Sequence, residues 1–180
     1  MPVSIVKETI ELPSVTCDSD GNAWLTKKIN LKPGQRHMLQ QVDYFLDRYP
    51  TMPNATGLTC EIVISAYPSI PTDMPFSGSA TEGVKSYPAG GDDSVLFKAQ
   101  LQIFDLANID NLNRPASQFP SETISAMNKS FFYTDHIYIN VCLKCAADEL
   151  IEGFGMSFMF VLDDKNTSSL EHSLGVLSEQ

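Results

Sequence analysis

Four cysteines come first among the residues that could do chemistry, because thiolates bind zinc and form disulfides. They are Cys17, Cys60, Cys142 and Cys145. The last two are three residues apart in a segment of alternating hydrophobicity, and in a strand such residues project to opposite faces. They cannot easily bind one metal ion together. We therefore predict buried, unreactive thiols, no metal site and, for a chain made in the cytoplasm, no disulfide.

Histidines would be needed for most proton-transfer or metal chemistry. The chain has three, which are His37, His136 and His172. They are far apart, and no serine or carboxylate lies at a spacing that identifies a catalytic triad or a zinc motif. We expect each histidine at a strand end or on the surface.

Carboxylates offer two further possibilities. Pairs among Asp43, Asp47, Asp105 and Asp110 could act as the acid and the base of a glycosidase, but sequence spacing favours solvated side chains on outward strand faces and in turns. We predict that the chain is not an enzyme and uses no cofactor.

A calcium loop is suggested by the spacing of Asp18, Asp20 and Asn22. A glycine is required at the sixth position of such a loop and a glutamate at the twelfth, but these positions hold Ala23 and Ile29. The segment is better interpreted as a turn.

Composition and charge narrow the classes of partner. The chain has 180 residues and a net charge of −10, with 12 Lys and Arg against 22 Asp and Glu. Nucleic acids and anionic membranes are bound through clustered basic residues, and here these residues are scattered. We expect no direct nucleic-acid partner and no membrane. The start of the chain has no basic and apolar leader, and every apolar run is shorter than the ~20 residues that span a bilayer.

The elements that must position these residues are strands, because hydrophobic residues alternate with period two from the first residues to about Asp163. The alternating segments are 3–12, 25–31, 36–47, 58–67, 95–106, 123–133, 137–145 and 156–162. Segment 3–12 reads as an edge strand that stops at Pro13 and pairs with 25–31. Segment 36–47 would also suit a helical turn, but its flanking turn residues favour a strand.

The irregular segments set the domain organisation. Residues 1–165 are predicted to form a single β-sandwich domain, with a long loop at 68–93 rich in Pro and Gly. Residues 146–152 could form one short helical turn. The tail, residues 166–180, would place Leu170, Leu174 and Leu177 on one helix face and could dock on its own domain or on a neighbour.

The fold class that follows is all-β, a two-sheet antiparallel sandwich of about eight strands with jelly-roll or related Greek-key topology. With strands such as Leu58–Tyr67 and Ile137–Cys145 separated by Pro-rich crossings, the chain resembles viral single jelly-roll structural proteins.

The resemblance implies a capsid, vertex or decoration subunit in the virion, made in the host cytoplasm. Its partners would be copies of itself, as a homo-oligomer, and other structural proteins of the particle. Contacts would use loops and termini, and we expect a subunit anchor at Ile70, Met74 and Phe76 in the long loop. The basic arm that holds the genome in many small viral shells is missing, which suggests an outer position or a shell filled by other means.

Two other functions stay open. A carbohydrate- or receptor-binding β-sandwich would need exposed Trp or Tyr beside carboxylates, whereas core packing is the simpler role for most aromatic residues of this chain. A cupin-like metalloenzyme is the least favoured, because it needs His and Glu ligands that converge on one metal.

Overall fold

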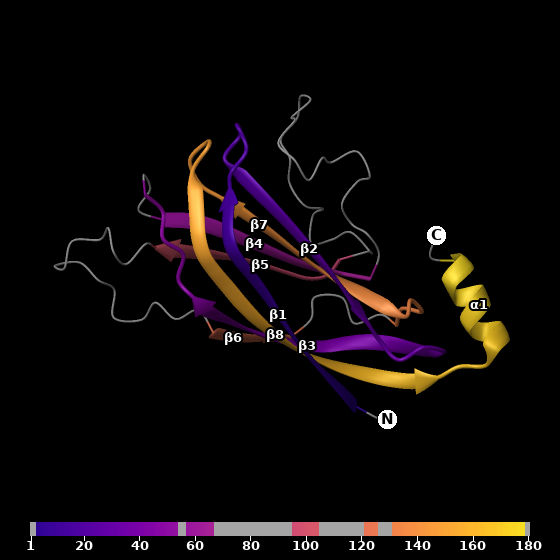
Figure 1. Cartoon of the computed structure of the whole chain (residues 1–180). Helices are drawn as coiled ribbons and strands as arrows, with labels where there is room; N and C mark the ends of the chain where they lie inside the picture. Colours follow the sequence, from indigo (N-terminus) through magenta and orange to yellow (C-terminus); the bar gives the residue numbers. More distant parts are fainter. Residues whose placement is uncertain (1–2, 54–56, 67–94, 105–120, 126–130, 179–180) are drawn as a thin grey trace.

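Two antiparallel sheets face each other across one core (Figure 1). The computed structural model describes residues 3–53, 57–66, 95–104, 121–125 and 131–178. The strands within these residues are β1 (Val3–Thr16), β2 (Asn22–Asn30), β3 (Gln35–Arg48), β4 (Gly57–Ser65), β5 (Val95–Phe104), β6 (Ser121–Ser125), β7 (His136–Lys144) and β8 (Leu150–Asn166). They are followed by the helix α1 (Ser169–Ser178).

The strand order identifies the topology. The first sheet has the order β1-β8-β3-β6 and the second has the order β2-β7-β4-β5. The pairs β1–β8, β2–β7, β3–β6 and β4–β5 are all antiparallel and nested, so that the chain resembles one long hairpin rolled into two layers. This is a jelly roll, and it confirms the predicted fold class.

Period-two alternation builds the core, because every second side chain of a strand faces the opposite sheet. On β8, Met156, Phe158, Phe160 and Leu162 are buried, while the residues between them are half-buried. The second sheet contributes the buried Ile137, Ile139, Val141 and Leu143 of β7 and Cys60, Ile62 and Ile64 of β4. The ambiguous segment 36–47 is a strand, as predicted, with register shifts after Leu39 and Leu46.

The expected pairing of the first two strands is wrong. β1 pairs with β8 and β2 pairs with β7, so the two strands belong to different sheets. They run along neighbouring edges, where the Nζ of Lys27 donates to the carbonyl oxygen of Thr9 at 2.8 Å. β1 also continues beyond Pro13 to Thr16. Because β1 is an edge strand, as predicted, proline can lie within it without losing a bond of the sheet.

Two other boundaries differ from expectation. Residues 146–148 form a turn with Asp148 at φ 56°, and β8 begins directly afterwards, so the helical turn expected at 146–152 is wrong. The segment expected as a strand at 123–133 is β6 over Ser121–Ser125, and residues 126–130 lie outside the described residues. Further on, Phe132 forms an isolated bridge with His37.

The long loop predicted at 68–93 lies outside the described residues. The division into a domain of residues 1–165 and a tail of residues 166–180 stays a prediction. The tail contains α1, which stands beyond the end of the sandwich where β8 ends (Figure 1). No helix in the described part of the chain is long and apolar enough to cross a membrane.

Candidate functional site

Among the described residues, large apolar side chains are exposed on two parts of the molecule. The first is the outer face of the first sheet, meaning the face turned away from the core. Val3 and Ile5 of β1 and Phe45 of β3 point outward there and are 58%, 60% and 46% exposed. The second place is α1, where Leu170, Leu174 and Leu177 are 69%, 58% and 67% exposed. We call these three residues the leucine stripe.

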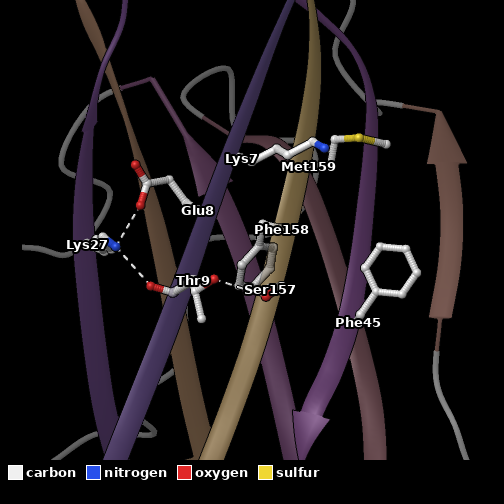
Figure 2. Close-up of a pocket in the computed structure, with 8 residues that line it drawn as sticks. All are labelled: Lys7, Glu8, Thr9, Lys27, Phe45, Ser157, Phe158 and Met159. Atoms are coloured by element: carbon white, nitrogen blue, oxygen red, sulfur yellow. Dashed lines mark hydrogen bonds and ion pairs between the residues drawn. The ribbon is translucent and has the colours of Figure 1, made fainter.

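A hollow of about 710 Å³ opens at the first sheet (Figure 2). Its lining comes from β1, β2, β3 and β8 and comprises Lys7, Glu8, Thr9, Lys27, Phe45, Ser157, Phe158 and Met159. We call it the outer-face hollow. The register explains the gathering, because Ser157 of β8 lies opposite both Thr9 of β1 and Phe45 of β3. Met159 lies one alternation further along the same face of β8 and opposite Lys7.

Hydrogen bonds fix the polar part of the outer-face hollow. The hydroxyls of Thr9 and Ser157 are 3.0 Å apart, and Ser157 donates to Oδ2 of Asp47 at 2.5 Å. The Nζ of Lys27 is 2.6 Å from Oε2 of Glu8 (Figure 2). Lys7 takes part in none of the ion pairs found among the described residues. Most polar groups of the hollow therefore form hydrogen bonds or ion pairs with one another, and the ring of Phe45 stays accessible to solvent or to a partner.

Helix α1 is attached to the sandwich by its polar side. Glu171 accepts a hydrogen bond from Nη1 of Arg36 at 3.3 Å, and Nε2 of His172 lies 3.6 Å from Oδ1 of Asp135. Gly175 is buried against the ring of Tyr133, which a Cβ at this position would overlap. The leucine stripe is thus left facing away from its own domain.

The subunit anchor predicted at Ile70, Met74 and Phe76 lies outside the described residues. It stays a prediction. The sequence analysis did place the three leucines of the stripe on one helix face, but it missed Phe45, Val3 and Ile5. They could have been recognised in the sequence as apolar residues at the alternate positions of a strand that face solvent, where the positions that face the core are already apolar.

His37 was expected at a strand end or on the surface, and it lies near the start of β3 but not on the surface. Although it is the third residue of β3, His37 is 1% exposed. Its Nδ1 lies 2.7 Å from Oδ1 of Asp164, and its Nε2 lies 3.1 Å from the carbonyl oxygen of Lys32. His136 does lie at a strand end, as the first residue of β7, and His172 is half-buried on α1.

The solvated position expected for acidic residues is also wrong in part. Asp43 is buried and accepts hydrogen bonds from Nε2 of Gln41, whereas Asp47 is exposed. Asp105 and Asp110 lie outside the described residues.

Glu61 is a buried acid that the sequence analysis did not single out. It pairs with Lys98 at 2.6 Å and with Lys144 at 2.7 Å. Burial alone would raise the pKa of Glu61, but hydrogen bonds from Lys144 and Lys98 outweigh it and hold the pKa below the ordinary value. The cluster of Glu61, Lys98 and Lys144 links β4, β5 and β7, and we expect it to stabilise the second sheet.

The cysteines are free, with Cys17, Cys60 and Cys142 buried and Cys145 half-buried. Burial raises the pKa of Cys17 to about 11 and that of Cys142 to about 12, and it also raises those of Cys60 and Cys145. Within the described ranges no group of three or more His, Cys, Asp or Glu residues is placed to hold a metal ion. Asp18 accepts hydrogen bonds from the backbone of Asp20 and Asn22, as in the predicted turn.

The raised pKa values predict a loss of stability at alkaline pH. Because the folded pKa of Cys17 lies above its ordinary value of 9.0, the stabilisation from its neutral buried thiol is complete below pH 9 and is lost as the pH rises toward 11. For Cys17 this amounts to about 2–3 kcal/mol. Urea unfolding of the reduced protein between pH 8 and pH 11 measures it. A Cys17→Ala variant should show a smaller decline, and an equal decline would contradict the assignment.

Comparison with known proteins bears on the fold. No family model matches the sequence, and no curated protein matches it. VP1 of Trichodysplasia spinulosa-associated polyomavirus in complex with GM1 oligosaccharide is 9% identical with a TM-score of 0.51, and the match covers 89% of this chain and 93% of VP1. The same VP1 in complex with sialylated precision glycooligomers gives 10% identity and a TM-score of 0.50, covering 89% and 94%.

At these identities the likeness shows the fold alone. VP1 is a single jelly-roll viral capsid protein. The expected resemblance to viral single jelly-roll structural proteins is therefore confirmed at the level of the fold.

Proposed function

We propose that this chain is a structural subunit of a viral particle, as a capsid, vertex or decoration protein that assembles with copies of itself. Its other partners are structural proteins of the same particle, and its place is the virion after synthesis in the host cytoplasm. The observation that carries the proposal is the location of the exposed apolar side chains. Among the described residues the large exposed ones lie on the outer face of the first sheet and on the leucine stripe.

Clustered exposed apolar groups mark contact sites, whereas single ones are ordinary on any surface. The leucine stripe is the stronger case. A helix that merely covered its own domain would turn its leucines inward, because burying a leucine stabilises by about 1.5–3 kcal/mol. Here the inward side carries Glu171, His172 and Gly175 instead.

The charge of the chain supports protein partners over nucleic acid. A net charge of −10 repels a phosphate backbone. Of the lysines near the two surfaces, Lys27 is already paired with Glu8. We therefore assign no genome contact to this subunit.

Electron microscopy of the purified full chain tests the proposal. We expect closed particles, rings or shells, of uniform diameter when the protein is concentrated. Irregular aggregates or a field without particles at any concentration would contradict it.

A carbohydrate-binding role is the second candidate, and the outer-face hollow is the observation that favours it. The exposed ring of Phe45 lies there beside the hydroxyl of Ser157 and close to the carboxylate of Asp47, which bonds that hydroxyl. Against it, Trp24 and Tyr44 are buried, and Tyr49, Tyr133 and Tyr138 are only partly exposed. A monomer that binds soluble oligosaccharides, and loses this binding on Phe45→Ala, would favour the second candidate.

A further inference from the structure

We propose that the edge of β1 from Val3 to Lys7 accepts an extended, acidic segment of a partner protein as an additional strand of the first sheet. We call these five residues the open edge. The inference goes beyond the proposed function, because it concerns a partner with a different sequence and does not require copies of this chain to assemble. It starts from the strand order, in which β1 lies at the edge of the first sheet with β8 on its other side.

Alternate residues of β1 turn their backbone groups toward the free side of the strand. In an antiparallel pair, successive residues direct their N–H and C=O groups alternately toward one side and the other. The carbonyl oxygen of Thr9 accepts a hydrogen bond at 2.8 Å from Nζ of Lys27, which belongs to β2 of the second sheet (Figure 2). Thr9 and the other odd-numbered residues therefore face away from β8. Pro13 belongs to this set, as expected for a residue without an N–H.

The two halves of this edge differ. In the half that begins at Thr9, Lys27 occupies a carbonyl oxygen and Pro13 offers no donor. Charged residues and prolines placed in this way protect a sheet edge from further strands. On the open edge, the outward N–H and C=O groups of residues 3, 5 and 7 form no hydrogen bond with any residue that the structure describes. Such a row of unpaired groups is a template for an added strand.

The side chains of the open edge are those of a contact surface. Val3 and Ile5 are apolar and lie in a regular strand, yet they are 58% and 60% exposed. The Cβ atoms of directly facing residues on neighbouring antiparallel strands are about 4.5–5.5 Å apart, so an added strand would cover both side chains. We therefore assign apolar side chains to the two partner positions opposite Val3 and Ile5.

Lys7 specifies the charge of the partner. It is exposed, lies on the same face as Ile5 and takes part in none of the ion pairs found among the described residues. The open edge contains no acidic residue, so its one charged side chain is positive. Opposite charges at directly facing positions stabilise neighbouring strands. We therefore assign a carboxylate to the partner position opposite Lys7.

The β1 strand of a second copy does not meet this requirement. When two such strands pair about the centre of the open edge, Lys7 of each copy faces Val3 of the other. A register in which Lys7 faces Glu11 would bring the two copies of Thr9 together, where Lys27 already occupies the carbonyl oxygen. The occupant is therefore a segment with a different sequence.

A synthetic peptide of seven residues tests the open edge in the full chain. It alternates threonine with one glutamate and two valines, so that the glutamate faces Lys7 when the valines face Ile5 and Val3. Amide hydrogen exchange followed by NMR gives the result. In the free protein we expect slow exchange at Val6, which bonds to β8, and fast exchange at Ile5 and Lys7. The peptide should slow Ile5 and Lys7 by on the order of tenfold or more and leave Val6 unchanged.

Two changes separate strand pairing from other binding. A peptide with N-methylated valines keeps its side chains but loses the backbone donors, and Ile5→Pro removes an outward N–H without removing a bond to β8. Each should weaken binding by on the order of tenfold in titration calorimetry. Ile5→Val is the control and should bind like the wild type, and circular dichroism checks that each variant is folded. Equal binding of the N-methylated peptide, or no slowing of Ile5 and Lys7 at millimolar peptide, would overturn the proposal.

A charge exchange tests the assigned carboxylate. Lys7→Glu should weaken binding of the glutamate peptide by about tenfold, and a peptide with lysine in place of glutamate should restore it. Equal binding of both peptides to both proteins would overturn the acidic partner. Slow exchange at Ile5 and Lys7 without peptide, lost on dilution, would show that a second copy occupies the edge and would overturn the choice of partner.

Discussion

Replacing His37 with alanine is expected to lower the free energy of unfolding by about 3–5 kcal/mol, because it leaves the buried side chain of Asp164 without its partner. The side chains of His37 and Asp164 are 1% and 6% exposed, and their Nδ1 and Oδ1 atoms are 2.7 Å apart. The other ring nitrogen faces the carbonyl oxygen of Lys32, which can only accept a hydrogen bond. The buried pair therefore places both ring nitrogens of His37 and one carboxyl oxygen of Asp164 in hydrogen-bonding contacts away from water.

Urea unfolding of matched variants checks this prediction. His172→Ala removes another histidine that faces a carboxylate, but its pair with Asp135 is longer, at 3.6 Å, and more exposed, so we expect a loss below about 1 kcal/mol. The double variant His37→Ala, Asp164→Ala should be more stable than His37→Ala alone, since no buried carboxyl group without a partner remains. Equal losses for the two single variants would contradict the structural importance of the buried His37–Asp164 pair.

Phe160→Ala should cost a similar amount, about 3–5 kcal/mol, for a different reason. Phe160 is fully buried on β8, where it lies opposite Val6 of β1 and Val42 of β3. Its ring stacks on Phe158 with the centroids 6.0 Å apart. Truncation leaves a cavity at the centre of the first sheet that the strands cannot close.

Phe45→Ala is the matched control, since it makes the same change on the same sheet at a ring that is 46% exposed. We expect the free energy of unfolding of this variant to change by no more than about 0.5 kcal/mol in the monomer. Thermal or urea unfolding at low protein concentration measures both. A loss at Phe45 as large as that at Phe160 would mean that the outer face is not a free surface.

Much of the fold could be predicted because alternation is a local signal. The strands β4, β7 and β8 contain strict period-two patterns, and their positions and their inward residues were predicted. Pairing could not be predicted, because β1 binds β8 about 150 residues away and local order suggested its neighbour β2. The extension of β8 back to Leu150 was hidden by glycines at 153 and 155.

The candidate site was predictable only in part. The spacing of Leu170, Leu174 and Leu177 gives a helix face directly, but which side of that helix meets the domain depends on Arg36 and Tyr133, which are distant in sequence. The outer-face hollow exists because three strands lie side by side in one register, and no local pattern contains that information. The buried pair of His37 with Asp164 was missed for the same reason.

The buried pair of His37 and Asp164 lies close to the point where α1 leaves β8. The ion pair joins the beginning of β3 to the end of β8, from which α1 departs, so it helps to fix where the leucine stripe projects. A rigid departure point would matter for the proposed assembly, because α1 could then meet a neighbouring subunit at a constant angle. We therefore expect variants that loosen this pair to weaken assembly as well as folding.

Light scattering coupled to size exclusion, run on the wild-type chain over a range of concentrations, tests the central claim most directly. We expect a discrete mass that is a whole multiple of 19.9 kDa. On dilution this mass should fall to that of the single chain as the subunits dissociate. A mass of 19.9 kDa at every concentration would contradict a self-assembling structural subunit.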